Sequence, residues 1–254
     1  MAEYIVEIKS LSKNFAGVCA LKQLNFGVLK GQIKGIIGPN GAGKTTVIKL
    51  ITGIYPMDQK EGKILFKGKN IAGMKTHQIA QLGIAQTFQI CNPFKNLTVI
   101  ENVMAGRYLK GRSNFFTDAL GLPRNKQQEK RVFDFALKKL EFVNLASKAF
   151  EIAGRLATGE QKLLEIARAL AFEPEMIFLD EPAGGLNPLE SLRLKNVILA
   201  IKDSGVTVVL VEHNMDVIMT VCDEIMVLNF GEKIAEGPAN EVKNNPLVIK
   251  AYLG

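Results

Sequence analysis

Cysteine is scarce in this sequence, and no metal-binding spacing of cysteines occurs. The 254 residues include three cysteines, Cys19, Cys91 and Cys222, which lie far apart and are odd in number. There is no CxxC pair and no cysteine–histidine cluster. Disulfide frameworks and structural zinc sites depend on such pairs, so neither is expected here. A reduced, cytoplasmic compartment suits this cysteine usage best.

Long apolar runs are also absent. The first ten residues, MAEYIVEIKS, include Glu3 and Glu7 and have no apolar centre, so we expect no signal peptide. No run approaches the roughly 18–20 apolar residues that cross a bilayer. If the protein works at a membrane, we therefore expect another chain to supply the membrane-spanning part.

Charge is neither strongly one-sided nor concentrated. Lysine and arginine number 32 against 25 aspartate and glutamate, a net charge of +7. Such an excess could suit nucleic acid or an anionic membrane. The basic residues are scattered, however, and no run of like charge reaches about five or six residues. A mildly basic solvated surface explains the pattern, and no nucleic-acid partner is expected.

The elements that are present alternate between strands and helices. Residues 4–30 alternate loosely up to Gly31, which favours antiparallel strands. Ile33–Ile37 predicts a short buried strand, and Lys44–Thr52 predicts a helix closed by Gly53. The runs EMIFLDEP and VTVVLVEH predict buried parallel strands whose carboxyl ends carry chemistry. This order predicts a parallel α/β core.

Three further segments complete the expected fold. Residues 188–205 predict a helix with one apolar face, formed by Leu194, Val197, Ile198 and Ile201. EIMVLNFGEKIAEG predicts a hairpin around Phe230–Gly231. Residues 92 to about 158 predict a mostly helical insert, with helical spacing of Phe133, Leu137 and Leu140. The stretch 110–125 within it is irregular and aromatic.

The stretch GPNGAGKT fits the phosphate-loop pattern G-x4-G-K-[ST]. With the next threonine, it comprises Gly38, Pro39, Asn40, Gly41, Ala42, Gly43, Lys44, Thr45 and Thr46. Glycines allow the backbone to approach an anion closely, and consecutive N–H groups at a helix start can surround a polyphosphate. Lys44 would contact the β- and γ-phosphates, and the Thr45 hydroxyl would bind Mg²⁺.

Charged residues follow two of the buried strands. Adjacent strand residues point to opposite sides, so Asp180 and Glu181 need not share a role. Asp180 would hold Mg²⁺, and Glu181 would be the general base that activates water. His213 could donate a hydrogen bond to a γ-phosphate, although a histidine satisfied within the core is more common. Gln89 is a weaker signal still, because a single glutamine is usually only part of the polar surface.

Taken together, these motifs resemble the ATP-binding subunit of an ABC transporter. The order of phosphate loop, TFQ, helical insert, LATGEQ, FLDEP, GGLNP and VEHNMD matches that family over nearly the whole chain. The resemblance implies one nucleotide-binding domain over residues 1–254. Its fold is a P-loop NTPase core with a parallel sheet, an N-terminal antiparallel β subdomain, and a helical signature subdomain over about 92–158. It also implies a Mg-dependent ATPase that uses ATP and Mg²⁺.

The resemblance also implies individual roles. Glu181 corresponds to the catalytic base and His213 to the switch histidine. Gln89 corresponds to the Q-loop glutamine, which senses Mg²⁺ and water and couples to the transmembrane partner. Phe15 is similar to the aromatic residue that stacks on adenine, and a core phenylalanine remains the alternative.

The segment Leu156–Gln161, here called the signature segment, occupies the family's signature position. There the family contacts the γ-phosphate bound by the opposite subunit, and the corresponding residues are Ala157, Thr158, Gly159 and Glu160. Alanine, threonine and glutamate replace the serine, glycine and glutamine of that pattern. Thr158 and Gln161 fit a capping box, with Gln161 reaching back. A carboxylate near a γ-phosphate repels it. We therefore expect that the signature segment still contacts the γ-phosphate, but binds it more weakly than a segment with serine would.

The resemblance extends to the importer ATPases for branched-chain amino acids, and urea and short-amide importers share much of it. It implies separate permease subunits and a second, identical or paralogous ATP-binding subunit, paired head to tail with two ATP molecules. A periplasmic or extracellular binding protein would be an indirect partner. The expected location is peripheral, at the cytoplasmic side of the cell (inner) membrane. The alternatives are the ATPase of a lipopolysaccharide-type exporter, a soluble non-transport ABC ATPase, and a P-loop kinase.

Overall fold

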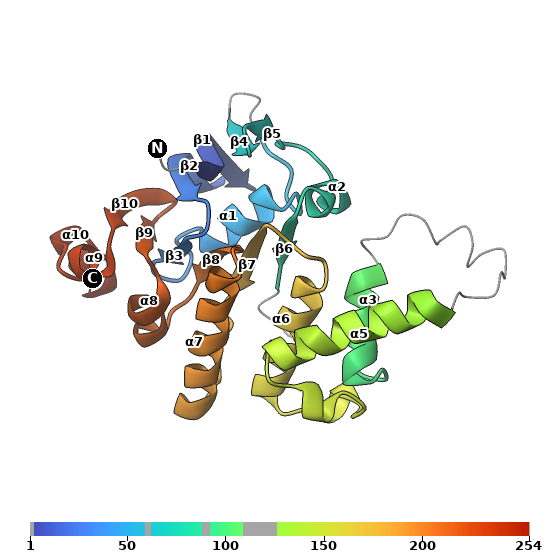
Figure 1. Ribbon diagram of the computed structural model, residues 1–254. Helices are drawn as coiled ribbons and strands as arrows, with labels where there is room; N and C mark the ends of the chain where they lie inside the picture. Colours follow the sequence, from blue (N-terminus) through green and yellow to red (C-terminus); the bar gives the residue numbers. More distant parts are fainter. Residues whose placement is uncertain (1–2, 59–61, 88–91, 109–125, 254) are drawn as a thin grey trace. The chain divides into compact units, whose positions relative to one another are not determined.

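The computed structural model describes residues 3–58, 62–87, 92–108 and 126–253 (Figure 1). The chain divides into two compact units. The first comprises Met1–Gln86, Glu175–Gly184 and Ser191–Gly254, and the second comprises Thr87–Pro174 and Gly185–Glu190. Among the described helices, none has both the length and the hydrophobicity needed to span a bilayer.

One sheet of the first unit is antiparallel and contains the N-terminal strands. Its order is β2 (Val18–Leu29), β1 (Tyr4–Phe15), β4 (Lys63–Phe66) and β5 (Lys69–Asn70). The antiparallel strands expected in residues 4–30 are therefore confirmed. The chain reverses at Ala16–Gly17, where both residues have positive φ, 44° and 90°.

The other sheet of this unit has six strands, of which five are parallel. Its order is β10 (Glu232–Gly237), β9 (Glu224–Asn229), β3 (Ile33–Ile37), β8 (Thr207–Val211), β7 (Met176–Asp180) and β6 (Ile84–Gln86). Every residue of β3, β7 and β8 is buried, which agrees with their continuous apolar runs. Because these strands are parallel neighbours, their carboxyl ends lie along one edge of the sheet.

The expected hairpin at Phe230–Gly231 joins β9 to the antiparallel strand β10. Both turn residues have positive φ, 46° and 79°, as a tight two-residue hairpin requires. The Gly231 N–H donates to the Ala42 carbonyl at 3.1 Å, and the Lys22 N–H donates to the Gly231 carbonyl at 2.9 Å. A Cβ at position 231 would lie 2.6 Å from the Ala20 carbonyl oxygen. The turn therefore packs tightly against β2 and the phosphate loop.

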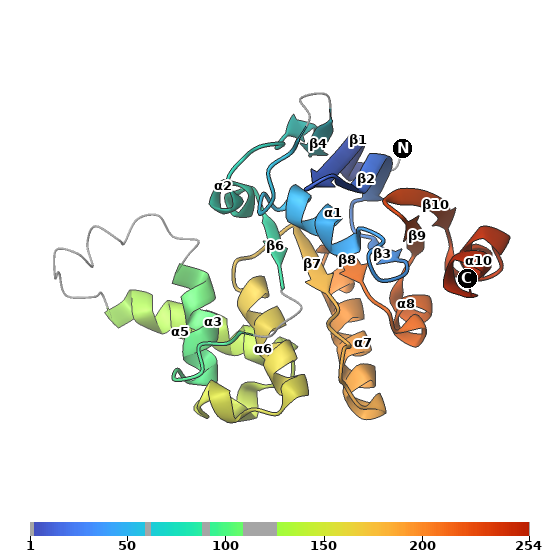
Figure 2. The same cartoon turned by 180° about the vertical axis from the view of Figure 1, so that it is seen from behind.

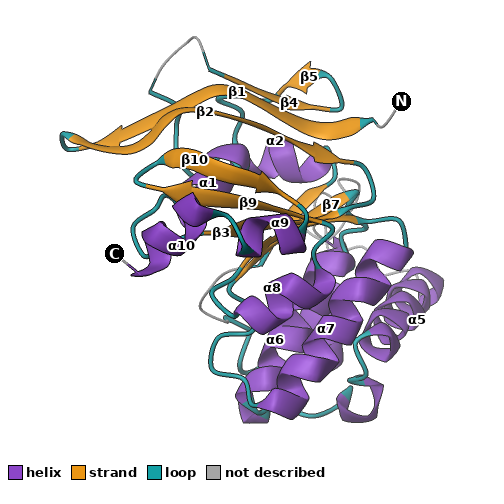
Figure 3. Ribbon diagram, turned by 90° about the vertical axis from the view of Figure 1, so that its left-hand side faces the viewer, coloured by secondary structure: helices purple, strands orange, loops and turns teal. Residues whose placement is uncertain are grey.

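Helix α1 (Lys44–Ile51) contributes to a core that both sheets share. Its Val47 and Ile51 belong to one cluster of buried side chains with Leu11 of β1 and Phe178 of β7. In Figures 1 and 3, α1 lies on the side of the six-stranded sheet that faces the four-stranded sheet. The core thus fixes the helix that follows the phosphate loop.

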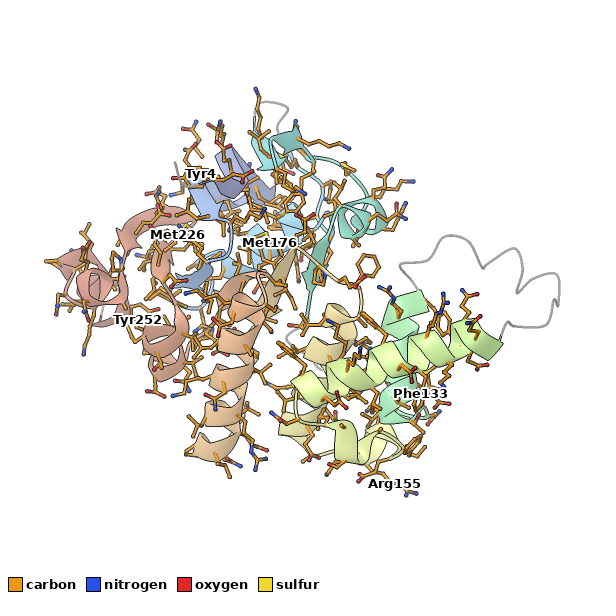
Figure 4. The ribbon with its side chains drawn as sticks, in the orientation of Figure 1. Tyr4, Phe133, Arg155, Met176, Met226 and Tyr252 are labelled. Carbon is orange, nitrogen blue, oxygen red and sulfur yellow. The ribbon has the colours of Figure 1, made fainter. Side chains whose placement is uncertain are left out.

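Helices α7 (Pro188–Asp203) and α8 (Met215–Val221) lie on the other side of the six-stranded sheet (Figure 3). The expected apolar face of α7 is confirmed, because its members Leu194, Val197, Ile198 and Ile201 are buried. Met176 and Met226, labelled in Figure 4, are fully buried on β7 and β9. The remaining helices of this unit are α2 (Thr76–Gln81), α9 (Ala239–Lys243) and α10 (Pro246–Leu253).

The second unit is helical. Its elements are α3 (Val99–Tyr108), α5 (Lys126–Phe142), the short 3₁₀ helices η1 (Ala146–Lys148) and η2 (Ala153–Arg155), and α6 (Thr158–Leu170). Helix α3 lies against both α5 and α6 (Figure 2). Gly106 permits this approach, because a Cβ there would lie 2.5 Å from the Arg168 carbonyl oxygen. The unit includes all of α6, beyond the boundary near residue 158 that the sequence suggests.

Helix α5 accounts for the helical spacing of Phe133, Leu137 and Leu140. Leu140 is fully buried, whereas Phe133, labelled in Figure 4, stacks on Phe150 with ring centroids 6.3 Å apart. The irregular aromatic stretch expected at 110–125 lies outside the described residues.

Candidate functional site

The glycine-rich loop Gly38–Thr45 joins β3 to α1, which confirms the strand–loop–helix order. Gly43 caps the helix with a φ of 105°. A Cβ on Gly38 would lie 2.1 Å from the Leu228 carbonyl oxygen, and one on Gly43 would lie 2.7 Å from that of Ala20. Glycine therefore lets the loop pack against its neighbours. The first N–H groups of α1 have no intrahelical acceptor, and such groups bind anions.

Lys44 turns its ammonium group back onto this loop. Its Nζ donates to the carbonyl oxygens of Gly38 at 2.7 Å and Pro39 at 2.9 Å. Burial lowers the pKa of Lys44, while the negative charges of Glu181 and Asp180 oppose that effect. The Lys44 ammonium is thus held beside the loop, close enough to Glu181 and Asp180 to be stabilised by their negative charges.

Asp180 is a buried carboxylate at the carboxyl end of β7. It is 7% exposed, and its Oδ1 has no hydrogen-bond partner among the described residues. Burial, and next the charge of Glu181, raises the pKa of Asp180 from 3.8 to about 6, against the opposing charges of Lys49 and Lys44. A buried carboxylate oxygen without a donor fits a cation such as Mg²⁺, for which oxygen is the preferred ligand. Within the described residues, no cluster of three or more metal-binding side chains occurs.

Glu181 and His213 form a pair beside Asp180. The Nε2 of His213 lies 2.8 Å from the Oε1 of Glu181, and the two side chains are 40% and 22% exposed. His213 is therefore not a core histidine, which was the alternative left open by the sequence. Glu181 has a φ of +50°, and its N–H donates to the Val211 carbonyl at 2.8 Å. This conformation is uncommon for a residue with a side chain.

Sequence reasoning missed Glu212, the residue before His213. Glu212 is 2% exposed and accepts backbone N–H groups from Ala183, His213 and Asn214. A carboxylate directly after the apolar run VVLV was the available signal, because a charged residue next to a buried strand needs hydrogen-bond donors around it if it is buried too.

Phe15 lies at the end of β1 and is 38% exposed, so it is not a core phenylalanine. The ring of Tyr55 meets it edge to face, with centroids 5.1 Å apart. The Lys13 ammonium lies 5.2 Å from the Phe15 ring centroid. Tyr55 has no motif of its own and could not be identified from the sequence.

Gln89 lies outside the described residues, as does Cys91. The chain just beyond them is anchored to α6, since the Asn92 N–H donates to the Glu165 Oε1 at 3.3 Å. Arg168 donates to the Asn92 carbonyl at 3.2 Å and lies over the Phe94 ring. The segment that follows Gln89 is thus held by the helix that follows the signature segment.

The expected capping box at the signature segment is wrong in its register. Helix α6 begins at Thr158, and its N-cap is Ala157. Glu160, not Gln161, reaches back: its Oε2 accepts the Ala157 N–H at 3.2 Å. The Gln161 amide donates to the Leu156 carbonyl at 2.9 Å instead. Alanine offers no side-chain acceptor, so only half of a capping box is formed.

Lys148, at the end of η1, supports the helix start that has its N-cap at Ala157. The Lys148 Nζ lies 2.8 Å from the Glu160 Oε1, and this contact raises the pKa of Lys148. The ion pair holds the Glu160 side chain in the orientation that reaches Ala157. The negative charge introduced at position 160 thus has a cation beside it.

The rest of the signature segment contacts the start of α7. Ala157 and Thr158 are exposed, whereas Gly159 is buried. A Cβ on Gly159 would lie 2.6 Å from the Oε1 of Glu190. Glu190 and Asn187 form a reciprocal capping box, with N–H to side-chain distances of 3.0 and 2.9 Å. Asn187 therefore caps α7.

The first unit brings most of the expected site residues together. The phosphate loop, Asp180, Glu181 and His213 lie at the carboxyl ends of the neighbouring strands β3, β7 and β8. The signature residues belong to the second unit.

Comparison with known protein families agrees with this geometry. The sequence pattern described as "ABC transporter" matches residues 21–184. The chain belongs to the ABC transporter family. A second pattern, "Branched-chain amino acid ATP-binding cassette transporter", matches residues 232–254 of this ABC chain. The resemblance inferred from the motifs is therefore confirmed.

Curated relatives match over nearly their full length. The branched-chain amino acid transport ATP-binding protein BraF of Pseudomonas aeruginosa is 40% identical, covering 100% of this chain and 99% of the relative. LivG of Escherichia coli K12 is 36% identical with the same coverage. The probable LivG of Archaeoglobus fulgidus is 39% identical over 98% of this chain and 95% of the relative.

Solved structures confirm the fold. An ATP-binding cassette of an ABC transporter in its ADP conformation has a TM-score of 0.86 and 33% identity, covering 99% of both chains. A dimeric cassette bound to ADP and phosphate has a TM-score of 0.78 and 25% identity, covering 92% of this chain and 98% of the other. The chain is a nucleotide-binding ATPase of the ABC type, coupled to transport.

Proposed function

We propose that this chain is the Mg-dependent ATP-hydrolysing subunit of an importer for branched-chain amino acids or similar amino acids and amides. The observation that carries the ATPase part is the grouping of Lys44, Asp180 and the Glu181–His213 pair at one sheet edge. The full-length similarity to proteins named for branched-chain amino acid transport supports the substrate class. That similarity favours an importer over a lipopolysaccharide-type exporter or a non-transport ATPase.

The phosphate loop would bind the nucleotide. Backbone N–H groups from Gly41 to Thr46 surround the phosphates, and Gly38, Pro39 and Asn40 shape the loop before them. Lys44 would exchange its loop carbonyl acceptors for phosphate oxygens. Phe15 would stack on the adenine, with Tyr55 supporting the ring from its edge.

Thr45, Asp180 and Gln89 would hold the Mg²⁺. When bound, the ion neutralises charge that develops on the phosphates. The orphaned Oδ1 of Asp180 supports this assignment. Because burial keeps that oxygen from solvent, the carboxylate would gain its partner only when the cation binds.

Glu181 would act as the general base that takes a proton from the attacking water. His213, 2.8 Å away, would orient the Glu181 carboxylate and donate to a γ-phosphate oxygen. Glu181 is suited to meet water because its side chain is partly exposed, unlike that of Asp180 or Glu212.

We further propose that two ATP-binding subunits, identical or paralogous, pair head to tail. Ala157, Thr158, Gly159 and Glu160 would then contact ATP held by the partner. Separate permease subunits would place the pair at the cytoplasmic side of the cell membrane, and a binding protein would deliver the substrate. The dimeric state of similar cassettes supports the pairing.

The test has two stages. Purified protein should hydrolyse MgATP, and Glu181→Gln should lower kcat by at least roughly 100-fold while ATP binding is retained. In proteoliposomes that also contain its permease subunits and binding protein, leucine should stimulate the ATPase, and a sugar should not. Phosphate transfer to a small acceptor in place of water would contradict the ATPase assignment. Stimulation by a sugar alone would contradict the substrate class.

A further inference from the structure

Glu212 lies between the two turns that carry Glu181 and His213. Strand β8 ends at Val211, so Glu212 follows a fully buried run, and the residue is only 2% exposed. An ionised carboxylate is costly to bury unless donors surround it. The hydrogen-bond donors around the Glu212 carboxylate therefore show what its burial achieves.

Its two oxygens accept from both turns. The Ala183 N–H donates to Oε1 at 2.5 Å, and the N–H groups of His213 and Asn214 donate to Oε2 at 3.1 and 3.3 Å. Ala183 stands two residues after Glu181, in the turn that the Gly184 N–H closes on the Glu181 carbonyl at 3.2 Å. One carboxylate thus joins the backbone that carries Glu181 to the backbone that carries His213.

We propose that Glu212 is a positioning residue that sets the Glu181 and His213 side chains at their working separation for ATP hydrolysis. The proposal rests on the proposed role of Glu181 as the base. The Glu181 turn contains an unfavourable positive φ, so it needs outside support to keep its shape. The Glu181–His213 contact of 2.8 Å is the geometry that this support preserves.

The chemistry requires a carboxylate. Both of its oxygens accept hydrogen bonds, so it can serve donors on two sides. A glutamine has one acceptor oxygen and one NH₂ group, which would face a backbone N–H in either orientation. Glu212 is not itself a base for water, because both oxygens are engaged and the residue is buried.

The decisive variant is Glu212→Gln, studied as the full chain with MgATP. We expect kcat to fall roughly 10- to 100-fold, the effect of displacing catalytic groups by about 1 Å. The KM for MgATP should change by less than about threefold, since the phosphate loop is untouched.

Asp223→Asn is the matched control. Asp223 also accepts a strand N–H, that of Ile33 at 2.8 Å, and pairs with Lys202. It lies at the other end of β3, away from the phosphate loop. We expect this variant to melt at a lower temperature and to keep kcat within about twofold of the unaltered protein.

The two histidines of the chain give a readout that general destabilisation would not move. In ¹H–¹³C spectra of the folded protein, Glu212→Gln should shift the ring resonances of His213 and leave those of the exposed His77 in place. Asp223→Asn should leave both unchanged. A purely structural role for Glu212 would lower the melting temperature without altering kcat or the His213 resonances.

If Glu212→Gln does not fold, Glu212→Asp decides, because it keeps the charge but is too short to span both turns. A folded variant of either kind with unaltered kcat would overturn the proposal. If the unaltered protein itself fails to hydrolyse MgATP, the proposed function is wrong. That result is distinct from a failure of the Glu212 proposal, which requires an active unaltered protein and an equally active Glu212 variant.

Discussion

Asp180 and Glu181 are adjacent carboxylates with opposite surroundings. The strand places Asp180 inward, where burial raises its pKa to about 6. Glu181, the next residue, has a positive φ. Its side chain contacts His213 and remains partly exposed. One strand end thus supplies both an inward oxygen suited to a cation and a carboxylate that can meet water.

Replacing Asp180 by asparagine should stabilise the metal-free protein at alkaline pH. The folded-state pKa is raised from 3.8 to about 6, so the folded protein holds this proton more tightly than the unfolded chain does. The favourable contribution of the acid form is full below pH 4 and is lost as pH rises through 6. Asparagine cannot ionise, so at pH 8 we expect a gain of roughly 2–3 kcal/mol.

Urea denaturation of both proteins at pH 8 and pH 4.5 measures this gain. The stabilisation should shrink toward the lower pH, whereas MgATP hydrolysis should be lost at every pH. A gain of equal size at both pH values would rule out ionisation of Asp180 as its origin.

Sequence motifs identified residues that the structure brings together where each motif is contiguous. The phosphate loop and the pair after β7 are each written in a few consecutive letters. Glu212, Tyr55 and Lys148 were missed because their roles depend on contacts with residues distant in the sequence. Lys148 lies 12 positions before Glu160, and no local pattern connects them.

At the scale of elements, buried strands were the easiest to anticipate. Continuous apolar runs predicted β3, β7 and β8, and glycine with an alternating pattern predicted the hairpin at Phe230–Gly231. The start of α6 was placed one residue too late, because the capping box was assigned from the threonine hydroxyl. The structure uses Glu160 instead, since Lys148 holds that side chain over the first turn.

This ion pair predicts a charge-specific defect at the signature helix. Lys148→Met would leave the Glu160 carboxylate unbalanced at a helix start where the partner's phosphates are proposed to bind. In the Glu181→Gln background, the ATP concentration for half-maximal dimerisation should rise about three- to tenfold, or about 0.6–1.4 kcal/mol.

Adding Glu160→Gln to Lys148→Met should restore dimerisation, because it removes the unbalanced charge. Light scattering or analytical ultracentrifugation against ATP concentration provides the measurement. Equal dimerisation of Lys148→Met and the parent would refute the effect, and failure of the glutamine to restore it would point to lost packing.

At the scale of the whole molecule, the chain is a composite of two units that the sequence interleaves. The second unit is entered after β6 and left before β7, and a short piece, Gly185–Glu190, returns to it. Local periodicity marked the helical insert but gave no sign that all of α6 belongs with it. That grouping arises from the close approach of α3 at Gly106, which is a tertiary contact.

The altered signature predicts a property of the assembled pair. In the Glu181→Gln background, the double change Ala157→Ser with Thr158→Gly should tighten ATP-driven dimerisation, because a serine hydroxyl at the helix start can donate a hydrogen bond to the partner's charged phosphate, worth about 1.5–3 kcal/mol. Sedimentation measures the shift. Turnover is measured with Glu181 intact. If neither dimerisation nor turnover changes, the segment with Ala157 and Thr158 binds phosphate as well as one with serine and glycine at these positions.

The turn at Phe230–Gly231 has a bearing on the smallest functional fragment. The ABC transporter pattern ends at residue 184, and every letter of the phosphate loop precedes it. Yet the loop packs against residues well beyond position 184: the Ala42 carbonyl accepts the Gly231 N–H, and Gly38 packs against Leu228. A polypeptide shortened to the matched region would keep the whole phosphate loop but would lack the turn that this loop packs against.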